Sequence, residues 1–250
     1  YNFYNYNDPV INKNWEIKNS FLSYRDINKN YKQEISSELI SSDIVVLKNI
    51  GLKFENILQN RVIYFNDTEN DFNQLRVFPQ VSSKISFPLI KNNNKNSQIL
   101  EPVLIPIIAP YNNYSNDQKV SNSNIFSLNR ETSLSQWESG PRLNYGLNWL
   151  VSNNNLSINT NIGQSLKLNK DSEESNEEKS DYFITNMFDF KSFGYIKTDL
   201  TIDSENMYLK ENNINTSINI GNIKFGFDYD YESNNRIKTS EQISIGTKVN

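Results

Sequence analysis

A few charged side chains could take part in chemistry, because they interrupt segments that are otherwise apolar or regularly alternating. Glu101 lies inside the apolar run ILEPVLIPII of residues 99–108, where a carboxylate could form one half of an acid–base pair. The spacing offers no second carboxylate to work with it, so we interpret Glu101 as a side chain that faces a polar interior. Asp228 and Asp230 could hold a cation, but they alternate with aromatic residues and therefore belong to the polar face of a strand.

Two arginines lie on either side of the Gly140–Pro141 pair. Arg130 and Arg142 could bind an anionic headgroup, because a guanidinium group offers several N–H donors in a fixed plane. Exposed arginines are more often ordinary charges that contribute little to stability. We favour this second interpretation, in which both are charges at the rim of the fold.

The composition argues against an enzyme. The chain of 250 residues has no histidine and no cysteine, so it lacks the commonest general base and any thiol nucleophile. It has no glycine-rich phosphate-binding loop, and its formal net charge of -4 provides no basic surface for nucleic acid. We therefore expect no catalytic residue, no cofactor, no metal site and no nucleic-acid partner.

The elements that position these side chains are strands with one apolar and one polar face. Residues 143–151 alternate strictly except at Leu150, which is the period of a half-buried strand. Leu75–Leu89 is the cleanest such pattern, and at about 3.3 Å per residue it would span about 50 Å. Strands of this length are uncommon in soluble domains.

The overall composition fits a transmembrane β-barrel. Hydrophobic residues make up only 36% of the chain, yet aromatic residues reach 12%, whereas disordered chains are poor in aromatics. A barrel presents an apolar band to lipid and a polar interior to water, so half of each strand can be polar. A soluble β-sandwich or β-solenoid with a wet outer face is the alternative that composition leaves open.

Short turns and longer loops alternate along the second half of the chain, as in a barrel whose longer loops are extracellular. The span 110–141 is the longest loop, Asn169–Asp181 reads as a solvated acidic loop, and Gly221–Asn222 is a two-residue turn signal. We predict an all-β fold, an antiparallel up-and-down transmembrane β-barrel of about 12–14 strands that is a fragment of a larger barrel. Residues 1–250 are expected to be part of a single outer-membrane β-barrel domain, truncated at both ends.

Several short segments occur in an order that one protein family shares. Residues 21–27 (FLSYRDI) are similar to the family segment FLRRYDI, and residues 124–130 (NIFSLNR) to NLFxxNR. In these segments the chain resembles the C-terminal barrel of the lipopolysaccharide-assembly outer-membrane protein family, LptD (OstA/Imp). Residues 131–140 (ETSLSQWESG) depart from the family's FSGYDRxEGG, and only Trp137, Glu138 and Gly140 are similar. The resemblance implies structural motif residues at Leu100, Glu101, Pro102, Asn124, Phe126, Asn129, Arg130, Gly140, Arg142, Asn144, Tyr145, Gly146, Gly163, Gln164, Ser180, Asp181 and Tyr182.

The resemblance implies transport and not catalysis. Members of the family take lipopolysaccharide from a periplasmic bridge and deliver it to the outer leaflet through a barrel that parts sideways. The implied localisation is the outer membrane of a Gram-negative cell. The implied partners are lipopolysaccharide, outer-membrane lipid, an LptE-like lipoprotein plug, and an LptA-like bridge that binds an N-terminal domain outside this chain. A generic porin-like channel and a soluble extracellular β-sandwich that binds a ligand remain as alternatives.

Overall fold

The structure is a computed structural model, and it describes residues 2–8, 13–25, 31–47, 52–67, 72–93, 95–111, 120–127, 130, 138–168, 179–234 and 236–249. Among these residues, none belongs to a helix long and apolar enough to cross a bilayer. The described chain is all-β. Its strands are β1 (Asn2–Asp8), β2 (Lys13–Arg25), β3 (Tyr31–Leu47), β4 (Leu52–Asp67), β5 (Phe72–Ser86), β6 (Leu89–Asn92), β7 (Ser97–Ile108), β8 (Arg142–Ser152), β9 (Ser157–Lys167), β10 (Tyr182–Asp189), β11 (Gly194–Ile202), β12 (Leu209–Ile220), β13 (Ile223–Asn234) and β14 (Ile237–Val249).

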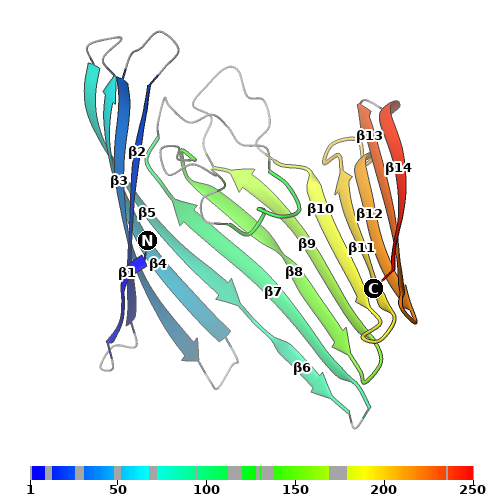
Figure 1. The fold of residues 1–250 in the computed structure, drawn as a ribbon. Helices are drawn as coiled ribbons and strands as arrows, with labels where there is room; N and C mark the ends of the chain where they lie inside the picture. Colours follow the sequence, from blue (N-terminus) through cyan, green and yellow to red (C-terminus); the bar gives the residue numbers. More distant parts are fainter. Residues whose placement is uncertain are drawn as a thin grey trace. The chain divides into compact units, whose positions relative to one another are not determined.

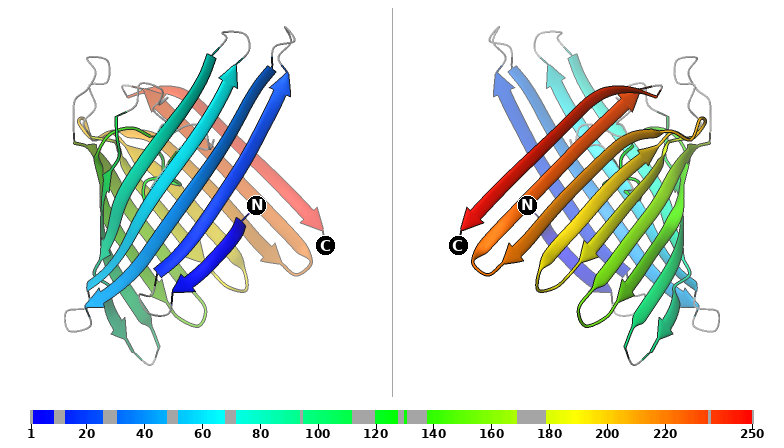
Figure 2. Two further views of the ribbon diagram at one scale, coloured as in Figure 1. Left: turned by 90° about the vertical axis from the view of Figure 1, so that its left-hand side faces the viewer. Right: turned by 90° about the vertical axis from the view of Figure 1, so that its right-hand side faces the viewer.

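The strands fall into two compact units, and β7 contributes residues to both. In the first unit the hydrogen-bonded order is β1-β2-β3-β4-β5-β7, and in the second it runs from β7 through β8 to β14 in sequence order, with β6 paired to β7. Within each unit, strands that follow one another in the chain lie side by side with a common tilt (Figures 1 and 2). The antiparallel up-and-down order predicted from the sequence is therefore confirmed, and the 14 strands agree with the predicted number. The first unit comprises Tyr1–Ile85, Ile105–Lys119 and Ser127–Arg142, and the second comprises Ser86–Leu104, Val120–Phe126 and Leu143–Asn250.

The first unit buries polar side chains and exposes apolar ones. On β5, Gln80 and Ser82 are 1% and 3% exposed, whereas Leu75 and Val81 on the alternate positions are 65% and 51% exposed. We call the face with the buried side chains the inner face and the opposite one the outer face. Soluble proteins show the reverse distribution, so the outer face needs an apolar surrounding. The other buried polar side chains of the inner face in this unit's strands are Glu38, Gln59 and Arg61.

The second unit also exposes its large apolar side chains. Trp149, Phe225 and Ile245 are 41%, 39% and 77% exposed. A two-layer soluble sandwich would seal these side chains between its sheets. The strands of each unit also form one continuous antiparallel ladder. For both reasons, the soluble β-sandwich alternative is wrong.

Two strand boundaries differ from the sequence prediction. The predicted strand Leu75–Leu89 is interrupted at residues 87–88, where β5 ends and β6 begins. Pro88 has no N–H to donate to the ladder, so the pairing stops there. The sequence pattern also predicts two separate short segments, an alternation that includes residues 52–55 and an apolar run at 62–65, but both belong to one strand, β4.

Two turns at the same end of the second unit are short. Gly221 adopts a left-handed φ of +59° between the paired residues Ile220 and Ile223. This conformation is the one that two-residue hairpin turns require, so the predicted Gly221–Asn222 turn is confirmed. The hairpin between β6 and β7 is closed by a hydrogen bond from Asn93 N to Asn96 O at 2.8 Å.

Strand β7 has an apolar inner face. Val103, Ile105 and Ile107 are 4%, 2% and 1% exposed, whereas the intervening prolines lie on the outer face. Glu101 shares the inner face with these residues and accepts a hydrogen bond of 3.3 Å from Asn148 Nδ2. The apolar run at residues 99–108 therefore places apolar side chains on both faces of this strand.

Candidate functional site

A short segment between β7 and β8 folds onto the inner face of the second unit. In this segment, Ser121–Phe126, the Asn124 Oδ1 atom accepts a hydrogen bond of 2.8 Å from Ser121 N. The N–H groups of Asn124 and Ile125 donate back to Ser121 O at 3.2 and 3.1 Å. Ile125 is 4% exposed. We call residues 121–126 the inner segment.

Two glycines allow the inner segment to approach the strands. A Cβ added at Gly146 on β8 would lie 2.0 Å from Ile162 O and 2.6 Å from Phe126 Cζ. A Cβ added at Gly163 on β9 would lie 2.9 Å from Ile125 Cγ1 and 3.0 Å from Phe126 Cζ. The Phe126 ring therefore lies against backbone that only glycine leaves uncovered. The structure thus brings together Phe126, Gly146 and Gly163, which are 20 and 17 residues apart in the sequence.

Polar side chains beside the glycines form hydrogen bonds that connect the start of β8, the end of β9 and the residues just before β10. Asn144 is fully buried, and its Oδ1 accepts a hydrogen bond of 2.7 Å from Ser165 Oγ. The Ser165 backbone N donates to Ser180 Oγ at 2.9 Å, and Ser180 N donates to Ser165 O at 2.8 Å. On the other face of β9, Gln164 accepts a hydrogen bond from the Tyr145 hydroxyl and donates to Ser180 O at 2.8 Å.

An ion-pair cluster follows at the same end of these strands. Lys210 Nζ lies 2.9 Å from both Asp181 Oδ1 and Asp203 Oδ2. Burial of the Asp203 carboxylate raises its pKa, but hydrogen bonds from Asn206 N and Lys210 outweigh this, so the pKa lies below its usual value. Asp203 and Lys210 were not predicted from the sequence. The only available signal was that opposite charges occur at the ends of successive strands.

The first unit contains a buried cluster of three charged side chains. Glu138 Oε1 lies 2.6 Å from Arg130 Nη1, and Glu138 Oε2 lies 3.2 Å from Arg142 Nη2. Arg130 and Glu138 are each 4% exposed and Arg142 is 1% exposed. Burial lowers the pKa of Arg130, although the neighbouring Glu138 acts in the opposite direction. The interpretation of both arginines as rim charges is therefore wrong, since both are desolvated and share one carboxylate.

Gly140 lies between the members of this cluster. Its φ of +80° is left-handed, and its N–H donates to Pro110 O at 3.1 Å. A Cβ at this position would lie 2.8 Å from Tyr111 Cε1. Glycine therefore allows the chain to turn tightly between Glu138 and Arg142.

The motif residues Leu100, Pro102 and Tyr182 lie in strands, and each pairs with or hydrogen-bonds to a residue opposite it. Leu100 pairs with Leu89 across the β6–β7 hairpin, and Pro102 O accepts a hydrogen bond of 3.2 Å from Phe87 N. Tyr182 begins β10 opposite Ile202. Asn129 lies outside the described residues, as does most of the acidic loop predicted at Asn169–Asp181.

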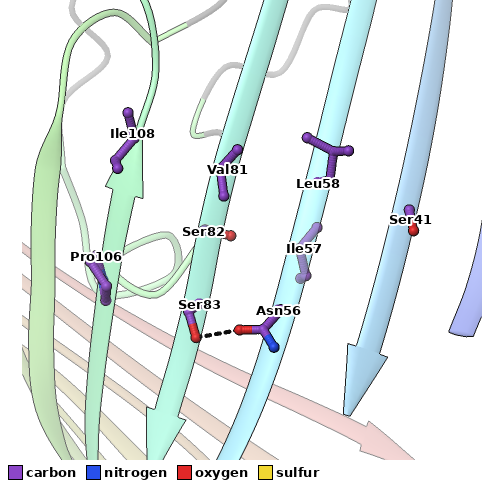
Figure 3. A pocket seen from close by; sticks show the side chains of 9 residues that line it. All are labelled: Ser41, Asn56, Ile57, Leu58, Val81, Ser82, Ser83, Pro106 and Ile108. Atoms are coloured by element: carbon purple, nitrogen blue, oxygen red, sulfur yellow. Dashed lines mark hydrogen bonds between the residues drawn. The ribbon is translucent and has the colours of Figure 1, made fainter. Parts of the chain in front are cut away.

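The outer face of the first unit carries a shallow groove of about 390 Å³ (Figure 3). Apolar side chains line much of it, and Ser83 Oγ donates a hydrogen bond of 2.7 Å to Asn56 Oδ1 at one end. Such internal pairing is what polar groups need on a surface that lipid covers. The residues that line the groove are Ser41, Asn56, Ile57, Leu58, Val81, Ser82, Ser83, Pro106 and Ile108.

The arrangement suits a wall between two environments. Apolar side chains cover the outer face, while glycines, amides and ion pairs hold connecting segments on the inner face. A search of curated proteins found no match to the chain. A comparison with protein-family models matched residues 19–248 to the family described as LPS transport system D, LptD. The chain belongs to this family of outer-membrane β-barrel proteins, and it is therefore a protein of lipopolysaccharide transport at the outer membrane.

Proposed function

We propose that the chain forms part of the wall of a translocon that inserts lipopolysaccharide into the outer leaflet of the outer membrane. The observation that carries the proposal is the reversed distribution of polar and apolar side chains on strands of an LptD family member. Lipopolysaccharide has a large polar sugar portion and several acyl chains. A wall with one polar and one apolar face separates the environments that these two portions need.

The inner face supplies polar groups that are already fixed in position. Glu38 Oε1 lies 2.7 Å from Arg61 Nη2 and also accepts a hydrogen bond from Gln59. Such a network keeps charged side chains ordered on a polar surface. Sugar hydroxyl and phosphate groups can move past this surface without contacting the apolar outer face.

The inner segment and the charged cluster support the proposal of a translocon over that of an open pore. Ile125 and Arg130 are both buried, so the connection between β7 and β8 does not extend freely into solvent at these points. The partners we propose are lipopolysaccharide, outer-membrane lipid, an LptE-like lipoprotein plug, and an LptA-like periplasmic bridge. The single-domain organisation of residues 1–250 stays a prediction.

The translocon and the porin alternatives predict different results for the full-length protein. We expect low conductance after reconstitution in planar bilayers, and a loss of newly made lipopolysaccharide from the surface of cells in which the protein is depleted. Surface lipopolysaccharide is measured by labelling intact cells. High steady conductance together with unchanged surface lipopolysaccharide would show that the protein is a porin.

A pair of variants tests the part that the inner segment plays. Replacing Ile125 and Phe126 with serine should loosen the inner segment and raise the entry of large antibiotics that the outer membrane normally excludes. Phe193→Ser is the matched control, because Phe193 lies in a short turn and is 65% exposed. Equal permeability of the two variants would exclude a role for the inner segment in sealing the barrel.

A further inference from the structure

A second pocket lies on the outer face of the second unit, at the hairpin between β6 and β7. It has a volume of about 270 Å³. Five of its six residues come from this hairpin, and the sixth is Trp149 near the end of β8. All belong to one compact unit. The lining residues are Leu89, Ile90, Lys91, Gln98, Leu100 and Trp149.

The pairing of β6 with β7 places two apolar side chains opposite each other in one part of the pocket and two polar side chains opposite each other in the other part. Leu89 pairs with Leu100 across the hairpin, and Lys91 pairs with Gln98. Directly opposite residues of an antiparallel pair project from the same face. The two pairs are two residues apart along the strand, which is about 7 Å. An amphipathic molecule could contact both pairs if its polar group lay about 7 Å from its first methylene groups.

The polar part carries positive charge. Within the described part of the chain, no carboxylate lies within 4 Å of Lys91 Nζ, and the Lys91 side chain is exposed. The nearest acid in the sequence, Glu101, lies on the inner face and accepts a hydrogen bond from Asn148. Lys91 is therefore available to pair with an anion, and the amide of Gln98 opposite it can donate to the same group.

The pocket lies at the end of the unit that has the short turns. The β6–β7 hairpin closes at Asn93–Asn96, and β8 ends at Ser152, three residues after Trp149. In outer-membrane barrels the short turns are periplasmic, and tryptophan is enriched where hydrocarbon meets headgroups. The pocket thus lies at the level of the phosphate groups in the leaflet on the periplasmic side.

We propose that this pocket binds one glycerophospholipid of the periplasmic leaflet. The phosphate pairs with Lys91 and accepts a hydrogen bond from Gln98, while an acyl chain lies against Leu89, Leu100 and Trp149. The site rests on the outer-membrane placement of the family and not on the insertion of lipopolysaccharide. It would anchor this hairpin at a fixed depth in the membrane.

The test is lipid retention by the purified full-length protein, measured by native mass spectrometry. The probes are phosphatidylglycerol and, as a lipid without phosphate, monogalactosyl diacylglycerol. Unaltered protein should retain one phosphatidylglycerol more strongly than the galactolipid. Lys91→Gln should weaken phosphatidylglycerol retention by about fivefold, as expected for one cation near anionic lipid, and should leave galactolipid retention unchanged.

The matched control is Lys95→Gln, in the same hairpin and outside the pocket. It should retain phosphatidylglycerol as the unaltered protein does, and Lys91→Arg should do the same because it keeps the charge. Equal weakening by Lys91→Gln and Lys95→Gln would mean that only general surface charge attracts lipid, and would overturn the proposal. So would unchanged retention in Lys91→Gln. Neither result would bear on conductance or surface lipopolysaccharide, which test the translocon separately.

Discussion

Replacing Glu138 with glutamine should cause the largest loss of stability of any change considered for this chain. Arg130 and Arg142 would lose the carboxylate that they share at 2.6 and 3.2 Å, in surroundings where both side chains are at most 4% exposed. Removing one partner of a buried ion pair costs about 3–5 kcal/mol, because it leaves charge that the protein must still desolvate. The measurement is the unfolding of purified full-length protein in detergent, followed by its heat-modifiable mobility in gels.

The matched control for this variant is Glu55→Gln on β4. Glu55 Oε2 lies 3.6 Å from Lys53 Nζ, and both side chains are about one-third exposed. Solvent screens such a pair, so the change should cost less than about 1 kcal/mol. If Glu138→Gln were as stable as Glu55→Gln, the buried cluster would have no structural role.

Gly146→Ala should release the inner segment from the strands. The added methyl group would lie 2.0 Å from the Ile162 carbonyl oxygen and 2.6 Å from Phe126 Cζ. The ring can move, but the carbonyl belongs to the neighbouring strand, so β8 and β9 must separate locally. Overpacking of this kind costs about 1–3 kcal/mol. The inner segment should then become accessible, and chymotrypsin should cleave after Phe126, whose ring lies against Gly146 and Gly163 in the unaltered protein.

Gly226→Ala on β13 is the control for the loss of a strand glycine. A Cβ at Gly226 would meet nothing closer than 3.9 Å, and substitutions without a clash usually change stability by less than about 0.5 kcal/mol. Resistance to chymotrypsin at Phe126 should therefore persist. Resistance of Gly146→Ala as well would show that Phe126 is not held against Gly146.

The strands could be predicted wherever one parity is apolar throughout. Leu75, Val77 and Val81 mark the outer face of β5 without ambiguity, and all three are more than half exposed. Asn56 and Asn60 interrupt the outer parity of β4, so neither face is uniformly apolar, and the pattern predicts two short segments where the structure has one strand. The break at Pro88 could have been anticipated from the missing N–H group.

The contacts between loops and strands could not be predicted. Arg130, Glu138 and Arg142 are spaced at 8 and 4 residues in a long connection without any period, so their convergence depends on how the loop folds. In the sequence, Gly146 and Gly163 are recognisable only as glycines on the polar face of an alternating strand. Their common contact with Phe126 follows from the pairing of β8 with β9, which local patterns do not specify.

The outer face should meet lipid, and the inner face should not. A nitroxide scan along residues 75–82 in full-length protein, reconstituted in lipid bilayers, separates these two faces residue by residue. We predict that accessibility to oxygen, relative to a polar nickel complex, peaks at Leu75, Val77 and Val81 and falls at Phe78, Gln80 and Ser82, which are at most 7% exposed. A ratio that favours the nickel complex at Leu75, Val77 and Val81 would place this face in water and contradict the account.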